Sequence, residues 1–366
     1  MKTYLNFLFT TLLIGGYSIS SFAFNNIDAL LDNADVTWVA EVYTDYAPTI
    51  NFRTIGRKEM QAKYGISTNT AISLKIQQQP APEQSIHLNE LRLAKLLLRI
   101  PSNTAIKFFK DPALKESLSY ADYHKITQEE SSDTVFVSQA DGTQKIGGIF
   151  NRQLYPNDVK LFRVKQILSY NIKTNQLDLI PIAVAPLTAK YNKERQLVST
   201  TPLFWVPIQE VMQAVDLNQS SINWAKRMTR SIDTDEVTVI KGKESFAEIL
   251  NKALNHYAKN PNSSKLYHTY GDMSPMSAKQ VKNINSGIDT IITFDPQTFE
   301  ETVSVVTNKA TPETMHKIRI IQDWVWNKET KSISIQFVAF APILKRYDSK
   351  QNFLNSGPLF YKKPKE

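Results

Sequence analysis

The sequence predicts an α+β fold made of two tandem related units, each a small antiparallel sheet with one or two covering helices. Three observations support this prediction. Residues 133–205 align without a gap with residues 289–361, so a 73-residue unit is present twice. Each copy contains two stretches of alternating apolar and polar residues around a polar turn, which is typical of a β-hairpin. An amphipathic helix precedes each copy.

The residues shared by the two copies are mostly of structural types. The copies have 14 identities, where chance pairing would give roughly four. Most are Pro, Asn, Thr, Ala or Phe, which suit turns, caps and packing. The polar exceptions are Arg163 with Arg319 and Gln166 with Gln322. By alternation the glutamines face the aromatic side of the hairpin, where each needs a buried partner. Such a repeat favours a scaffold over an enzyme.

The N-terminus has the pattern of a secretory signal peptide, which we place at residues 1–23. Lys2 supplies the positive start, residues 5–14 are largely apolar, and Ser21-Phe22-Ala23 fits a cleavage site. An uncleaved anchor is the alternative, but the apolar run is too short to span a bilayer. We expect the mature chain to begin near Phe24.

Two domains are predicted for the mature chain, residues 24–215 and residues 216–366. They contain the repeat cores 133–205 and 289–361 respectively. The first domain also contains a loop insertion near residues 77–84, where glutamine and proline form a run.

Helices are expected ahead of both repeat cores. In the second half Ser245 is the expected N-cap and Glu248 lies three residues later, which is the pattern of a capping box. Apolar residues then recur at helical spacing. The corresponding helix of the first half is predicted at residues 88–98. Pro156 and Pro312 predict a short helical entry directly before each hairpin.

Four strands form the two predicted hairpins. In the second copy, apolar residues alternate on one face of the first strand: Ile318, Ile320, Trp324 and Trp326. The alternation resumes after a turn at residues 327–332, and a one-residue slip would expose this face. The first copy has the same pattern over residues 162–170 and 177–185. Shorter strands are predicted at residues 134–137 and 290–294.

The composition limits the classes of function. The chain has no cysteine, which excludes disulfides, thiolate ligands and a bacterial lipid anchor. An exported chain without cysteine fits the periplasm of a Gram-negative cell. The net charge of +8 favours an acidic partner or a membrane surface, or reflects only a solvated surface. Nucleic acid is not expected, because an exported protein does not normally meet it.

No motif for catalysis, a cofactor or a metal ion is found. The five histidines lack metal-ligand spacing, and no nucleophile elbow or phosphate-binding loop is present. The acidic cluster Asp233, Asp235 and Glu236 lacks the spacing of a calcium loop. A hydrolase could use carboxylates such as Asp323 and Glu329, but only closeness in sequence supports that pair. A cell-wall-acting enzyme or a monomeric ligand-binding module is retained as the alternative.

The second half resembles the GldN/PorN family. Residues 222–233 resemble its Trp-x-Lys-Arg…Arg-x-Ile-Asp opening. Residues 318–324 are similar to its Arg-Ile-Lys-Glu-Asp-Trp hairpin, and residues 339–342 to its Gly-Ile-Ala-Pro strand. Residues 203–205 and 359–361 resemble its Phe-Trp-Ile-Tyr-Tyr-Pro segment.

The resemblance implies a non-enzymatic periplasmic component of the gliding-motility and type IX secretion machinery of Bacteroidota. It implies no cofactor, and it implies a ring formed with a GldK/PorK-like outer-membrane lipoprotein. The protein would then lie in the periplasm, associate with the outer membrane through that partner, and bind other copies of itself. The doubled hairpin unit and the end at Glu366 indicate a divergent or duplicated member.

Docking through aromatic-rich hairpins and exposed sheet edges is the expected mechanism. The residues predicted to contact the lipoprotein or a neighbouring copy are Trp224, Arg227, Arg230, Arg319, Trp324, Trp326, Phe204 and Trp205. For the aromatic residues the alternative is packing in the core. For the arginines it is an ordinary position on the surface of a strand.

Overall fold

The computed structural model describes much of both halves of the chain. The described residues are 27–46, 93–102, 104, 106–128, 131–138, 143–152, 154–191, 197–208, 222–271, 274–285, 287–294, 298, 300–307, 309–347 and 352–364. The predicted signal peptide and the predicted loop insertion near residues 77–84 lie outside these residues, as does the first part of the helix predicted at residues 88–98.

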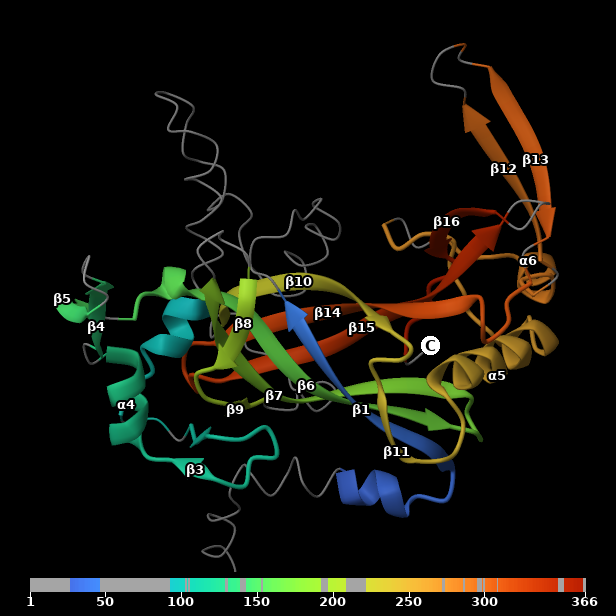
Figure 1. Cartoon of the computed structure of the whole chain (residues 1–366). Coiled ribbons are helices and arrows are strands. Elements are labelled where there is room, and N and C mark those ends of the chain that lie inside the picture. The colour runs from blue at the N-terminus through green and yellow to red at the C-terminus, as the bar shows by residue number, and fades with distance from the viewer. Residues whose placement is uncertain are drawn as a thin grey trace, which may run out of the picture.

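The first repeat core forms most of a six-stranded antiparallel sheet (Figure 1). The strand order is β11-β1-β6-β7-β8, and β9 also pairs with β7. The strands are β1 (Val36–Tyr46), β6 (Val159–Asn171), β7 (Gln176–Tyr191), β8 (Leu197–Pro202), β9 (Val206–Pro207) and β11 (Thr238–Lys241). The strands β6 and β7 are the predicted hairpin.

The second repeat core forms three strands of a four-stranded sheet in the order β10-β14-β15-β16. The strands of this sheet are β10 (Ile222–Asp233), β14 (Met315–Asn327), β15 (Ile333–Tyr347) and β16 (Phe353–Pro358). The ladder β10–β14 has the same register as β1–β6, including an irregularity at the second residue of β1 and of β10. β1 and β10 are therefore equivalent strands of the two sheets, and no strand was predicted at either position.

Short elements complete the described chain. Three two-stranded ladders are formed by β2 (Phe108–Phe109) with β3 (Ser117–Leu118), β4 (Ser131–Ser138) with β5 (Gln144–Arg152), and β12 (Ile288–Phe294) with β13 (Glu301–Thr307). The helices are α4 (Tyr120–Gln128), α5 (Phe246–Lys259), α6 (Ala278–Lys282), the 3-10 helix η2 (Pro156–Asp158) and helical residues 27–32 and 93–98. The helical entry predicted at Pro156 is present, whereas the chain at Pro312 forms only a turn.

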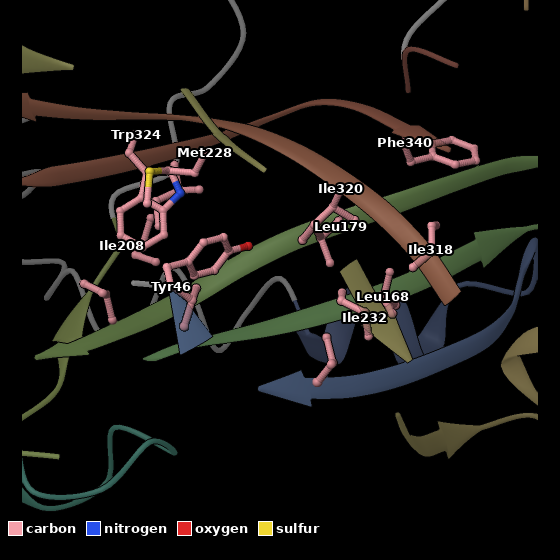
Figure 2. Packing of buried hydrophobic residues seen from close by; sticks show 14 of the residues in the cluster. Tyr46, Leu168, Leu179, Ile208, Met228, Ile232, Ile318, Ile320, Trp324 and Phe340 are labelled. Carbon is pink, nitrogen blue, oxygen red and sulfur yellow. The ribbon is translucent and has the colours of Figure 1, made fainter. Parts of the chain in front are cut away.

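The two main sheets pack against each other, and this corrects part of the predicted fold class. One buried cluster joins residues of both sheets, such as Leu168 and Leu179 from the first and Ile320 and Trp324 from the second (Figure 2). The molecule is thus mostly antiparallel sheet with few helices. The apolar face of each sheet is covered chiefly by the other sheet, because two faces that alternate in the same way can bury each other.

Helix α5 is the covering helix that the sequence predicted most specifically. The Ser245 hydroxyl accepts a hydrogen bond from the backbone N–H of Glu248, and the Glu248 carboxylate accepts one from the backbone N–H of Ser245. This capping box is as expected. The apolar side of the helix does not rest on its own half alone, because Phe246 stacks on Trp38 of β1 with ring centroids 5.3 Å apart.

Strand β11 also crosses between the halves. It follows β10 in sequence but pairs with β1 of the first sheet. Its Lys241 ammonium donates hydrogen bonds to the carbonyls of Leu31 and Asn33, at 2.7 and 2.9 Å. Trp38 Nε1 donates to the carbonyl of Glu244 at 2.9 Å. The two halves are therefore interlocked, and the domain boundary near residue 215 stays a prediction.

Candidate functional site

Two glutamines from equivalent positions of the repeat meet at the centre of the molecule. Gln166 of β6 and Gln322 of β14 are both 0% exposed. The Gln322 side-chain amide donates a hydrogen bond to Gln166 Oε1 at 2.5 Å. Each glutamine is thus the buried partner that the other requires. Identical residues meet in this way on the axis of an isologous dimer, so the two repeats pack like two subunits.

Two further residues extend this contact into a chain of hydrogen bonds. The Tyr46 hydroxyl donates to Gln322 Oε1 at 2.6 Å, and the Gln166 amide donates to Thr44 Oγ1 at 2.6 Å. All four side chains are buried. Burial disfavours the phenolate and raises the pKa of Tyr46 to about 12. The Tyr46 ring also contacts Trp324 edge-on, with centroids 4.9 Å apart.

The chain of hydrogen bonds is asymmetric, because Tyr46 and Thr44 both belong to the first half. The register places Ile232 and Arg230 of β10 at the corresponding positions of the second half. Neither can replace its counterpart, since isoleucine has no donor and arginine has no acceptor. The polar contact at the centre therefore requires one first half and one second half.

On the face opposite the glutamines, one ion pair joins β10 to β14 in the second sheet and another joins β1 to β6 in the first. In the second sheet Arg227 and Asp323 form two parallel hydrogen bonds of 2.6 and 2.9 Å, and their side chains are 8% and 0% exposed. In the first sheet the pair is Lys165 with Glu41 at 2.7 Å, so the cation and the anion have exchanged strands. Glu41 is at the register position of Arg227. Lys165, however, corresponds to Ile321 and not to Asp323.

The five aromatic residues predicted as contacts all lie in the interior. The exposed fractions are 8% for Trp224, 0% for Trp324, 2% for Trp326, 0% for Phe204 and 3% for Trp205. Trp205 belongs to a second cluster, on the outer face of the first sheet. This burial favours the alternative of core packing. A contact between any of these residues and a partner stays a prediction.

The three predicted arginines have different surroundings. Arg227 is held by Asp323. Arg319 donates to the Tyr361 hydroxyl at 3.2 Å. The equivalent arginine of the first sheet has an aspartate directly opposite on the neighbouring strand, whereas the residue opposite Arg319 is Ser231. Arg230 has a buried Nε atom with no hydrogen-bond acceptor among the residues that the structure describes. Among the described residues, Arg230 is therefore the candidate with the fewest polar contacts.

Several exposed apolar side chains lie on strands at the edges of the molecule, where the sequence did not predict a contact surface. Apolar side chains are exposed on the outermost strands of both sheets and on the β12–β13 hairpin, namely Val198 (65%), Phe353 (58%), Ile292 (52%) and Val303 (60%). Strands β5 and β13 were not predicted, although the alternating valines after Glu301 were an available signal. These outer strands carry backbone groups that another chain can pair with.

The acidic residues considered for other chemistry are engaged elsewhere or exposed. Asp323 is bound to Arg227, whereas Glu329 lies exposed in a turn, so the pair does not line a common site. Asp233 of the acidic cluster pairs with Lys317 at 2.7 Å. In the part of the chain that the structure describes, no group of three or more His, Asp or Glu residues is arranged to hold a metal ion. None of the described helices is long and apolar enough to cross a membrane.

These features define a duplicated antiparallel β protein whose shared residues hold its two halves together. The chain belongs to the GldN family: the family "Gliding motility associated protein GldN" matches residues 72–215 and 217–363. This confirms the predicted family and its tandem organisation. The family is a periplasmic, structural component of the gliding-motility and type IX secretion apparatus, and it is not a known enzyme family. No curated protein matches the chain.

Proposed function

We propose that the protein is a non-enzymatic scaffold of a type IX secretion or gliding-motility complex in the periplasm. It binds a GldK/PorK-like outer-membrane lipoprotein, which holds it at the outer membrane, and it associates with further copies to form a ring. The observation that carries the proposal is the family match over both halves of the chain.

The structure supports a binding role through what the repeat retains. The two copies share a packed hairpin, a turn and the central glutamine contact. Two sheets joined in this way share one buried core and have exposed outermost strands, which suits a protein that positions others. We keep Arg230 and Arg319 as the first candidates for partner contact, since neither has a carboxylate partner in the described structure.

Co-purification from outer-membrane extracts tests the proposal. The full-length chain is tagged, recovered from cells that produce it, and its partners are identified by mass spectrometry. Recovery of a GldK/PorK-like lipoprotein in stable amounts is expected. An Arg230→Glu variant should recover less lipoprotein than the control Ile172→Lys, at a residue that is 50% exposed, while circular dichroism shows that both variants fold. A chain that recovers no such lipoprotein would sink the proposal.

A further inference from the structure

The β12–β13 hairpin is a two-stranded arm that stands away from both sheets (Figure 1). Its strands pair over seven positions, from Ile288 with Thr307 to Phe294 with Glu301. In the described part of the chain no third strand joins them. A two-stranded hairpin is marginally stable in water at best, and a third strand or a packed apolar face is what stabilises it. A bound partner would therefore stabilise the arm more than it would stabilise either main sheet.

One face of the arm combines apolar and acidic groups. Ile292 and Val303 are directly opposite each other and are 52% and 60% exposed. Glu301 lies two residues before Val303 and so points to the same face, and Glu300 beside it is also exposed. An apolar pair flanked by carboxylates fits a partner that offers an apolar contact next to basic side chains.

The charge of the arm is opposite to that of the whole chain. Residues 288–294 and 300–307 contain Asp289, Glu300 and Glu301 but no lysine or arginine, whereas the chain has a net charge of +8. The same chain also has suitable basic groups. Exposed lysines without a salt-bridge partner in the described structure lie on or beside α5 and α6, namely Lys259, Lys265, Lys279 and Lys282.

We propose that the β12–β13 arm binds the basic surface of a second copy of this chain. Charge complementarity favours a second copy as the partner, because an acidic arm is attracted to the basic surface of another copy of the same chain. Binding covers the exposed Ile292–Val303 pair and brings Glu300 and Glu301 to lysines of the other copy. The inference rests on the self-association included in the proposed function and assigns the contact that produces it.

Light scattering and sedimentation of the full-length chain test the arm. Wild type should associate more strongly at low salt than at high salt, because salt screens the attraction between exposed charges. Two double variants, Ile292→Lys with Val303→Lys and Glu300→Lys with Glu301→Lys, should be monomeric at concentrations where wild type associates. Ile172→Lys is the control, and it should behave as wild type. Circular dichroism should show the same folded spectrum for all, because the altered side chains are exposed.

Zero-length cross-linking identifies the receiving surface. Unlabelled and nitrogen-15 chains are mixed and treated with a carbodiimide, which joins carboxylates to lysines in contact. Peptides of mixed isotope that link Glu300 or Glu301 to a lysine are expected. Cross-links confined to one chain would overturn the proposal, as would arm variants that associate as wild type does, or a wild type that stays monomeric.

The experiments distinguish a wrong assignment of the arm contact from a wrong proposal of the scaffold function. If the arm variants still associate while wild type recovers the lipoprotein, the arm is not the contact and the scaffold proposal stands. If wild type associates through the arm but recovers no lipoprotein, the arm stands and the scaffold proposal fails.

Discussion

Gln166 and Gln322 give the core a specificity that apolar residues alone would not supply. Apolar contacts tolerate many arrangements, whereas a buried amide without partners costs about 1–3 kcal/mol. The chain from Tyr46 through both glutamines to Thr44 satisfies these groups in one arrangement of the two sheets. A shifted packing would leave several donors and acceptors unpaired.

Replacing Gln322 by leucine should therefore lower the free energy of unfolding by about 1–3 kcal/mol, since it leaves the Tyr46 hydroxyl and Gln166 Oε1 without partners. Tyr46→Phe removes the first of these groups. The double variant should consequently lose less stability than the two single variants added together. Urea denaturation of the four chains measures this coupling. Losses that add to within about 0.5 kcal/mol would show that the contact is not coupled.

The two ion pairs allow a comparison between a fully buried and a partly exposed carboxylate. Asp323→Asn leaves the Arg227 guanidinium charged in a nearly dry place, and breaking such a pair costs about 3 kcal/mol or more. Glu41→Gln also leaves a largely buried cation, since the Lys165 side chain is 10% exposed, but it should cost less than Asp323→Asn because Glu41 itself is 25% exposed, against 0% for Asp323. Denaturation midpoints at neutral pH compare the two. Equal losses would mean that burial does not set the strength of these pairs.

At the level of elements, β11 is the segment that fastens the second half to the first. It pairs with β1, and the chain then turns at Gly242, whose φ of +99° is rarely adopted by other residues. A Cβ atom at this position would lie 2.9 Å from Trp38 Cδ1 and 3.0 Å from the carbonyl oxygen of Thr37. The close approach places α5 against Trp38.

Gly242→Ala should accordingly destabilise the protein by roughly 1–3 kcal/mol, through backbone strain and the contact with Trp38. Gly271→Ala is the matched control, because among the described residues no atom beyond its chain neighbours lies within 4 Å of the added methyl group. That control should change stability by less than about 0.5 kcal/mol. Thermal unfolding of both variants gives the comparison. A Gly242→Ala chain as stable as the control would argue against a strained close approach at this turn.

At the level of the whole molecule, one hydrophobic cluster serves both halves. The main cluster includes Trp38 and Phe162 of the first half and Phe246 and Trp324 of the second. The glutamine contact and β11 also join the two halves. If either sheet unfolded, the apolar face of the other would lose the surface that covers it. Each half alone would expose a large apolar surface.

Calorimetry should therefore show a single unfolding transition, with equal calorimetric and van't Hoff enthalpies. Two separated transitions would mean that the halves fold independently. For the same reason the fragment 289–366 is expected not to fold, because it lacks β10 and α5. A stable fragment with cooperative unfolding, measured by circular dichroism, would contradict the shared core.

Local patterns in the sequence identified the elements that depend on local chemistry. The repeat, both hairpins, the turn at Asn327 and the capping box of α5 are all present as expected. They could be predicted because alternation, turn residues and caps act over a few neighbouring positions. The glutamines were also identified as residues that need a buried partner. The sequence did not show which partner, because the two lie far apart along the chain.

The sequence alone determined the duplication, the hairpins and the family. The tertiary structure decided that the two sheets cover each other, that β11 joins the sheet of the other half, and that the predicted aromatic contacts are buried. The physical reason is that an apolar face identifies the side of a strand that avoids water but not the surface that covers it. That choice depends on the shape and the polar groups of both faces, such as Gln166 and Gln322.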